Sequence, residues 1–293
     1  MKKILITLHL NWYEIAMMEE MMNSLYNAIK FRKLNSIVDF HITYNYQTNF
    51  YTPTVSLENI FDEVKSHKIF QEFKIISNEK HDSDSFYCIA DYRHETYLKY
   101  SEEYDYIVWN EADLIFPEIF FYILDTLDIN EPHTLSFSCQ KMWDATWIPM
   151  EHESIQYISE AWLKENNLKM THGQHLTEKD VNEINRKYYK KMKIQRLDYQ
   201  KVDGGLFCLS KGLPTPFIGE NHHFFYEDTS AGIKFQYHRI PQFHVSSIIK
   251  GHNRDHINKK VNVSRTEQNI ENFNREKESS INAFHIFTSK LQK

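Results

Sequence analysis

The stretch that decides the fold is YDYIVWNEADLIFP, residues 104–117. Its first half, residues 104–110, is rich in aromatic and β-branched residues, which is typical of a central strand of a parallel sheet. Glu111 and Asp113 follow at once. Ligands of open α/β sheets bind beyond the carboxyl ends of the strands, so we expect both carboxylates at a binding edge. Such oxygens suit a hard divalent cation, although an isolated acid pair of this spacing is often only solvated.

Outward from this stretch, strand-like and helix-like patterns alternate along the chain. Apolar residues recur at period two in the predicted strands and at three or four in the predicted helices. The predicted strands cover residues 3–10, 36–44, 73–77 and 134–138, and the predicted helices cover 14–32, 57–72, 92–103 and 117–127. This order predicts an α/β fold with a mixed, mostly parallel central sheet.

Residues 151–200 differ in character, because they are highly charged. They contain two helical patterns, at 155–165 and 178–193, and Thr177 with Asp180 forms a capping-box pattern before the second. We expect a helical insertion here. Residues 264–293 predict one C-terminal helix.

Composition excludes several classes of protein. The chain has 293 residues with 34 Lys and Arg against 40 Asp and Glu, and the net charge of −6 gives no global attraction to nucleic acid or anionic membrane. All 7 glycines follow residue 172, so a glycine-rich dinucleotide turn or Walker A loop is excluded before it. Three widely spaced cysteines indicate a reducing, cytoplasmic compartment. No apolar run reaches the roughly 20 residues that span a membrane.

A second group of candidate residues lies in the last third of the chain. Gly204 and Gly205 leave room for a ligand against the backbone, Glu227 and Asp228 offer a general base, and His244 offers an imidazole. Each also has a simpler explanation: a tight turn, a helix N-terminus favoured by the macrodipole, and a core histidine, respectively.

The order of these features over residues 3–254 resembles the nucleotide-sugar-dependent glycosyltransferases of the GT-A fold, and specifically the inverting, family 2-like enzymes. Their D-x-D position reads Glu111-Ala112-Asp113 here, and the acid that follows their second strand is replaced by Tyr44-Asn45-Tyr46. The resemblance implies a Rossmann-type α/β/α sandwich over residues 1–263. Residues 1–117 would be the nucleotide-binding half and 201–254 the acceptor and metal half. It also implies Mn²⁺ or Mg²⁺ and a nucleotide-diphosphate sugar, first of all a UDP-sugar.

The resemblance also implies a role for each candidate. Asp113 would bind the metal, Glu111 would contact the ribose or the metal through water, and His244 would complete the metal shell. Asp228 would be the general base, with Glu227 beside it. The residues that would face the donor are Thr7, His9, Asn45, Asp91, Arg93, Gly204 and Gly205. Lys250, His252 and Arg254 would close over the diphosphate, or would form a basic surface loop.

Two rival functions and the acceptor stay open. A metal-dependent phosphoesterase or nuclease would use the same acids and histidine, and a non-catalytic sugar- or nucleotide-binding module would keep the fold alone. The acceptor could be a glycan, a lipid-linked sugar, a protein or a modified nucleic acid. Residues 186–196 contain six basic residues in eleven, which would suit an anionic acceptor or simply form a solvated helix face.

Overall fold

The computed structural model describes residues 1–11, 18–31, 36–45, 75–80, 89–139, 177–198, 202, 205–216 and 227–252. The helices predicted at 57–72, 155–165 and 264–293 lie outside these residues, so the domain limits that depend on them stay predictions. Within the described part of the chain, no helix is both long and apolar enough to cross a membrane.

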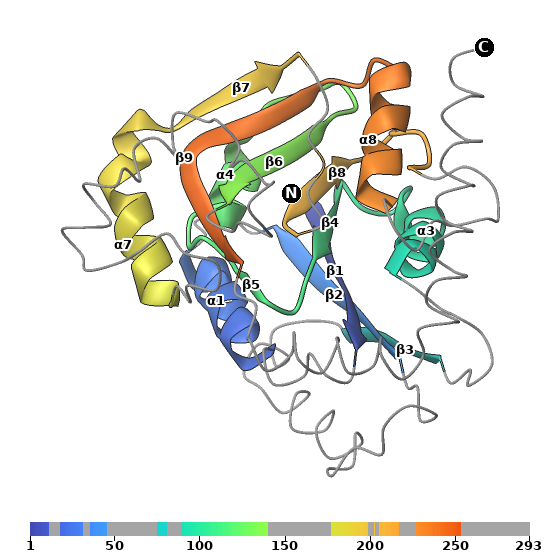
Figure 1. Ribbon diagram of the computed structural model, residues 1–293, viewed down its shortest axis with the longest axis horizontal. Helices are drawn as coiled ribbons and strands as arrows, with labels where there is room; N and C mark the ends of the chain where they lie inside the picture. Colours follow the sequence, from blue (N-terminus) through green and yellow to red (C-terminus); the bar gives the residue numbers. More distant parts are fainter. Residues whose placement is uncertain are drawn as a thin grey trace, which may run out of the picture.

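The described strands form one mixed sheet in the order β3-β2-β1-β4-β8-β6-β9-β5, and β7 pairs with β9 (Figure 1). Strands β1, β2, β3 and β4 are parallel to one another, and β8 enters antiparallel between β4 and β6. The strands are β1 (Lys3–Asn11), β2 (Ile37–Asn45), β3 (Ile75–Lys80), β4 (Tyr106–Asn110), β5 (Leu114–Ile115), β6 (Thr134–Cys139), β7 (Lys193–Leu197), β8 (Phe207–Ser210) and β9 (Gln242–His252).

Helices pack against both faces of the sheet, because the buried residues of the strands alternate between two apolar clusters. Val108 of β4 lies in the cluster with α1 (Met18–Phe31) and α4 (Phe120–Thr126). Trp109, the next residue, lies in the cluster with α3 (Ile89–Tyr100) and α8 (Glu227–Tyr237). The predicted α/β sandwich with a mixed, mostly parallel sheet is therefore confirmed.

Parallel pairing fixes which strand ends meet. The carboxyl ends of β1, β2 and β4 lie at one edge of the sheet. Strand β8 is antiparallel to both β4 and β6, so β6 runs in the same direction as β4. Strand β9 is parallel to β6, so the carboxyl ends of β6 and β9 lie at this same edge. The amino end of β8 lies at the same edge, because Phe207 pairs with Trp109. We call this the carboxyl edge, and it is where the sequence predicts ligand binding.

The segment after residue 177 differs from the prediction of one long helix. The predicted capping box of Thr177 and Asp180 is present, but α7 (Glu178–Tyr188) gives way to a 3₁₀ turn, η3 (Tyr189–Lys191), and then to β7. Strand β7 pairs antiparallel with β9, so this part of the predicted insertion extends the main sheet.

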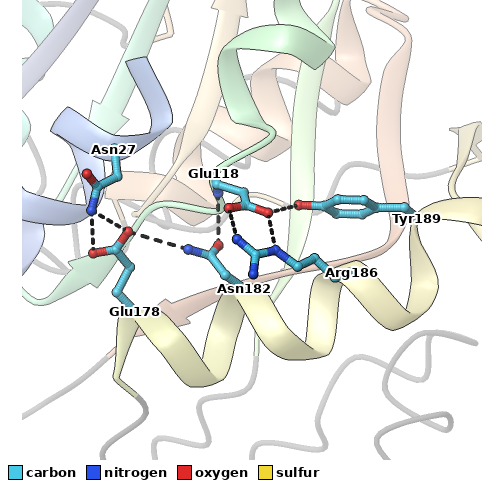
Figure 2. A network of polar contacts seen from close by, with 6 residues as sticks. All are labelled: Asn27, Glu118, Glu178, Asn182, Arg186 and Tyr189. Carbon is cyan, nitrogen blue, oxygen red and sulfur yellow. Dashed lines mark hydrogen bonds and ion pairs between the residues drawn. The ribbon is translucent and has the colours of Figure 1, made fainter. Parts of the chain in front are cut away.

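A polar network holds α7 against the segment that follows β5 (Figure 2). The carboxylate of Glu118 accepts two hydrogen bonds from Arg186, at 2.8 and 2.7 Å, and one from Tyr189 at 2.7 Å. The Glu118 amide donates to Asn182 Oδ1 at 3.1 Å. Burial raises the pKa of Glu118, but the bonds from Arg186 and Tyr189 outweigh it and hold that pKa below its usual value.

Candidate active site

Glu111 and Asp113 lie in one tight turn at the carboxyl edge. Glu111 follows β4 directly, and the turn is closed by the Leu114 amide, which donates to the Glu111 carbonyl at 3.2 Å. Asp113 is buried, whereas the Glu111 side chain is 21% exposed. The structure thus places the predicted acid pair beyond the end of a central strand, in a turn that fixes both backbones.

Arg93 on α3 supplies a buried positive charge beside this turn. Its guanidinium lies 4.5 Å from the centre of the Trp109 ring and 3.7 Å from Glu111 Oε1, and the residue is only 2% exposed. A guanidinium that stacks on an aromatic face and contacts a carboxylate has little freedom to move. Arg93 therefore holds Glu111 in place. Asp91 lies two residues earlier on the same helix, and its side chain is outside the described residues.

Strand β1 carries two buried polar residues, Thr7 and His9. The Thr7 hydroxyl donates to the Val108 carbonyl at 2.8 Å, so it serves the pairing of β1 with β4. Burial, with a smaller contribution from Arg93, lowers the pKa of His9 to about 3. His9 is therefore neutral near pH 7 and presents a hydrogen-bonding imidazole rather than a cation.

Tyr92 connects His9 to β2 and was not among the predicted site residues. Its ring centre lies 5.4 Å from that of His9 and 5.6 Å from that of His41, and its hydroxyl donates to the His41 carbonyl at 2.9 Å. Asn45 ends β2, where its backbone pairs with Asn11. No spacing pattern in the sequence marks Tyr92, because its partners are on two strands far away along the chain.

The pairing of β5 with β9 brings His252, not His244, next to the acid turn. His252 is opposite Leu114 in the register, one residue beyond Asp113, and Gly251 is opposite Ile115. His244 is opposite Ser136 near the other end of β9. A Cβ atom at Gly251 would lie 2.8 Å from Ile115 Cβ, so the absence of a side chain there allows this close approach.

His244 is completely buried and engaged by hydroxyl groups. Its Nδ1 lies 2.9 Å from Ser136 Oγ, and its Nε2 lies 3.2 Å from Ser138 Oγ. Because both ring nitrogens have hydroxyl partners, this geometry does not favour the predicted metal role. Among the residues that the structure describes, no group of three or more His, Cys, Asp and Glu side chains is arranged to hold a metal ion.

Lys250 is part of β9 rather than of a loop over the site. It is 1% exposed, and its ammonium group donates to the carbonyl of Gly205. The next residue, Leu206, is buried with a φ of 53°, a conformation that a branched side chain rarely adopts. Lys250 therefore holds a strained turn at the start of β8. Gly204 and Arg254 lie outside the described residues.

Glu227 and Asp228 are the first two residues of α8. Ala231 and Phe235 of this helix pack in the same cluster as Trp109 and Phe207, so α8 covers the face of the sheet on which Arg93 lies. Asp228 is half-buried, and the side chain of Glu227 is outside the described residues. The predicted base thus lies in the first turn of α8, where the helix N-terminus stabilises a carboxylate.

No model of a known protein family matches the sequence, and no curated protein matches it. Among solved structures, the inositol-1-phosphate CTP transferase from T. maritima is 9% identical, with 91% of this chain and 95% of that chain covered and a TM-score of 0.44. The glycosyltransferase GlyE of Streptococcus pneumoniae TIGR4 is 13% identical, with 64% and 40% covered and a TM-score of 0.31. S. aureus TarS in complex with UDP-GlcNAc is 10% identical, with 57% and 48% covered and a TM-score of 0.31. With TM-scores below 0.5, these likenesses do not by themselves identify the function of this chain.

Proposed function

We propose that this protein is a glycosyltransferase that moves a sugar from a nucleotide-diphosphate sugar, first of all a UDP-sugar, to an acceptor hydroxyl. The observation that carries the proposal is the turn of Glu111 and Asp113 at the carboxyl edge, with Glu111 held by the buried Arg93. The Arg93 guanidinium orients the Glu111 carboxylate, and the backbone turn fixes Asp113 two residues later, so both acids are positioned to bind a diphosphate through a divalent cation.

The side chains at the acid turn are chemically suited to bind Mn²⁺ or Mg²⁺. Glu111 and Asp113 would supply hard oxygen ligands, and His252 is the histidine that the register places beside them. The ion would stabilise the negative charge that develops on the departing diphosphate. A phosphoesterase or nuclease is less well supported, because such sites usually cluster more ligands than the described residues provide.

Asp228 would act on the acceptor side. It would take the proton of the acceptor hydroxyl as the oxygen bonds to the anomeric carbon, and the bond from that carbon to the diphosphate oxygen would break. A direct displacement of this kind inverts the configuration at the carbon. A positioned carboxylate base contributes on the order of 10²–10⁴-fold to the rate. We therefore expect Asp228→Asn to lower kcat by about that factor while nucleotide binding stays within twofold, and loss of both would contradict the role of Asp228 as base.

A thermal-shift panel tests the donor class. Nucleoside diphosphates and their sugars are added one by one, each with and without Mn²⁺. A ligand that binds only the folded state raises Tm. At a ligand concentration of 100 times Kd, the free energy of unfolding rises by about 2.7 kcal/mol. We expect a shift with one nucleotide that depends on Mn²⁺, and release of nucleoside diphosphate from the matching sugar. No shift with any nucleotide would overturn the proposal.

A further inference from the structure

Asn110, the last residue of β4, breaks the polarity pattern of its strand. Tyr106, Val108 and Asn110 alternate onto the same face of the sheet, and the first two belong to the apolar cluster under α1 and α4. Asn110 occupies the next position in that row and is only 3% exposed. A polar residue at a core position is unfavourable unless it has a function.

The carboxamide of Asn110 is only half used. Its Nδ2 donates to Met21 Sδ at 3.5 Å, and a thioether sulfur can only accept, so this contact orients the amide. Oδ1 is buried, and within the described part of the chain it has no hydrogen-bond partner. A buried acceptor left unpaired is destabilising. Stability therefore does not explain the residue.

Asn185 shows what a structural asparagine looks like in the same protein. It is fully buried, its Nδ2 donates to the Ile249 carbonyl at 2.9 Å, and its Oδ1 accepts from the Ile249 amide at 2.8 Å. Both ends of that carboxamide are thus satisfied by the backbone of strand β9. The contrast with Asn110 is between a completed and an uncompleted set of hydrogen bonds.

The position of Asn110 points to the ligand that completes the set. It lies opposite Leu8 of β1 in the register and beside Met21, in the first turn of α1, and it directly precedes Glu111. Its unpaired oxygen therefore belongs to the last residue of β4 at the carboxyl edge, next to the acid turn.

We infer that Asn110 is a specificity-determining residue, whose Oδ1 accepts a hydrogen bond from an N–H or O–H group of the bound nucleotide-diphosphate sugar. This inference rests on the proposed function. A carboxamide oxygen is neutral and can only accept, so it selects a neutral donor group on the nucleoside or the sugar and not the diphosphate.

The test compares Asn110→Leu with the wild type, and Asn110→Met serves as a second apolar variant in case the branched side chain does not fit. Thr215→Val is the matched control. Thr215 also has a buried oxygen that no group in the described residues satisfies, but it follows the far end of β8, where Ser210 pairs with Tyr106. Tm is measured without ligand, and Kd is measured for UDP and for UDP-sugars in the presence of Mn²⁺.

We expect both Asn110 variants to raise the Tm of the free protein by about 2–4 °C, because they remove an unpaired buried oxygen. We expect them to weaken binding by about 5- to 100-fold. A loss already seen with UDP places the donor group on the nucleoside, and a loss seen only with the UDP-sugars places it on the sugar. The control is expected to raise Tm without changing Kd.

Three results would overturn the inference. Affinity within twofold of the wild type in both variants would show that the oxygen contacts no ligand. A fall in Tm in both variants would show that Oδ1 is satisfied in the free protein. A wild type that binds no nucleotide would overturn the proposed function and this inference with it, and the wild-type measurement alone distinguishes that case.

Discussion

Gly251→Ala is the change that best tests how the fold positions the site. Gly251 pairs with Ile115, and an added Cβ would lie 2.8 Å from Ile115 Cβ, 2.9 Å from its Cγ1 and 3.1 Å from Val181 Cγ2. Ordinary contacts begin near 3.4 Å, so β5 must retreat by 3.4 − 2.8 = 0.6 Å or strain must be absorbed elsewhere. The nearest atom is a Cβ fixed to the backbone, which cannot swing aside.

The magnitude follows from this overlap. Overpacking of this kind typically costs about 1–3 kcal/mol, which corresponds to a fall in Tm of about 2–12 °C for a domain of this size. Asp113 directly precedes β5, so the same retreat displaces a carboxylate of the acid turn. Binding sites lose about tenfold or more when a ligand group moves by a large fraction of an ångström. We therefore expect a loss of both stability and Mn²⁺-dependent nucleotide affinity, measured by thermal unfolding and by calorimetric titration.

Val181→Ala is the matched control for Gly251→Ala. Val181 is fully buried on α7 and packs with Ile115 and Ile249, so its truncation costs a similar free energy, about 1–3 kcal/mol, without forcing β5 away from β9. We expect its nucleotide affinity to stay within twofold. An unchanged Tm in Gly251→Ala would refute the close packing, and an equal loss of affinity in both variants would refute the link between strand spacing and the site.

Three further changes test other parts of the account. Arg93→Met leaves Glu111 without its buried partner, so we expect a loss of about 2 kcal/mol in chemical denaturation together with weaker Mn²⁺-dependent binding; unchanged binding would mean that Glu111 needs no positioning. Burial lowers the pKa of His9 to about 3 and that of His41 to about 4, so the unfolded chain takes up protons that the folded chain does not. The stability that the two neutral histidines contribute is present above pH 6.5 and is lost as the pH falls. The free energy of unfolding is therefore expected to drop by about 2 kcal/mol per histidine between pH 7 and pH 5. Urea denaturation that gives the same free energy at both pH values would contradict this expectation. Glu118→Gln keeps the shape of the side chain but removes the negative charge that pairs with Arg186 of α7. We expect the free energy of unfolding, measured by thermal denaturation, to fall by about 1 kcal/mol while nucleotide binding is unchanged. An unchanged free energy of unfolding would show that the network of Figure 2 does not stabilise the fold.

The sequence predicts the parallel half of the fold well, because β1, β2 and β4 are runs of apolar or alternating residues between clear helical patterns. It does not predict β7, whose residues are half-buried or exposed and have no strand-like alternation of apolar residues. That strand exists because it pairs with Gln242–Ser246 of β9, about fifty residues later, and a contact of this kind leaves no local signal.

The candidate site is predictable to a similar degree. Glu111 and Asp113 are recognisable because they follow a buried strand, whereas only the family resemblance implies a donor-facing role for Arg93. The hydroxyl partners of His244 come from β6, more than a hundred residues earlier, so no spacing pattern reveals that its nitrogens are engaged. Asn110 did leave a signal, since it is a polar residue at the end of an apolar strand, but nothing in the sequence shows that its Oδ1 is buried without a partner among the described residues.

The central claim is that the acid turn after β4 binds a nucleoside diphosphate through a divalent cation. The most direct measurement is a calorimetric titration of UDP into the wild type and into Asp113→Asn, each with Mn²⁺ and with chelator. We predict binding by the wild type only when Mn²⁺ is present, and a loss of about tenfold or more in Asp113→Asn with its Tm unchanged within a few degrees. Binding by the wild type that is equally tight with chelator, or unchanged in Asp113→Asn, would contradict the claim.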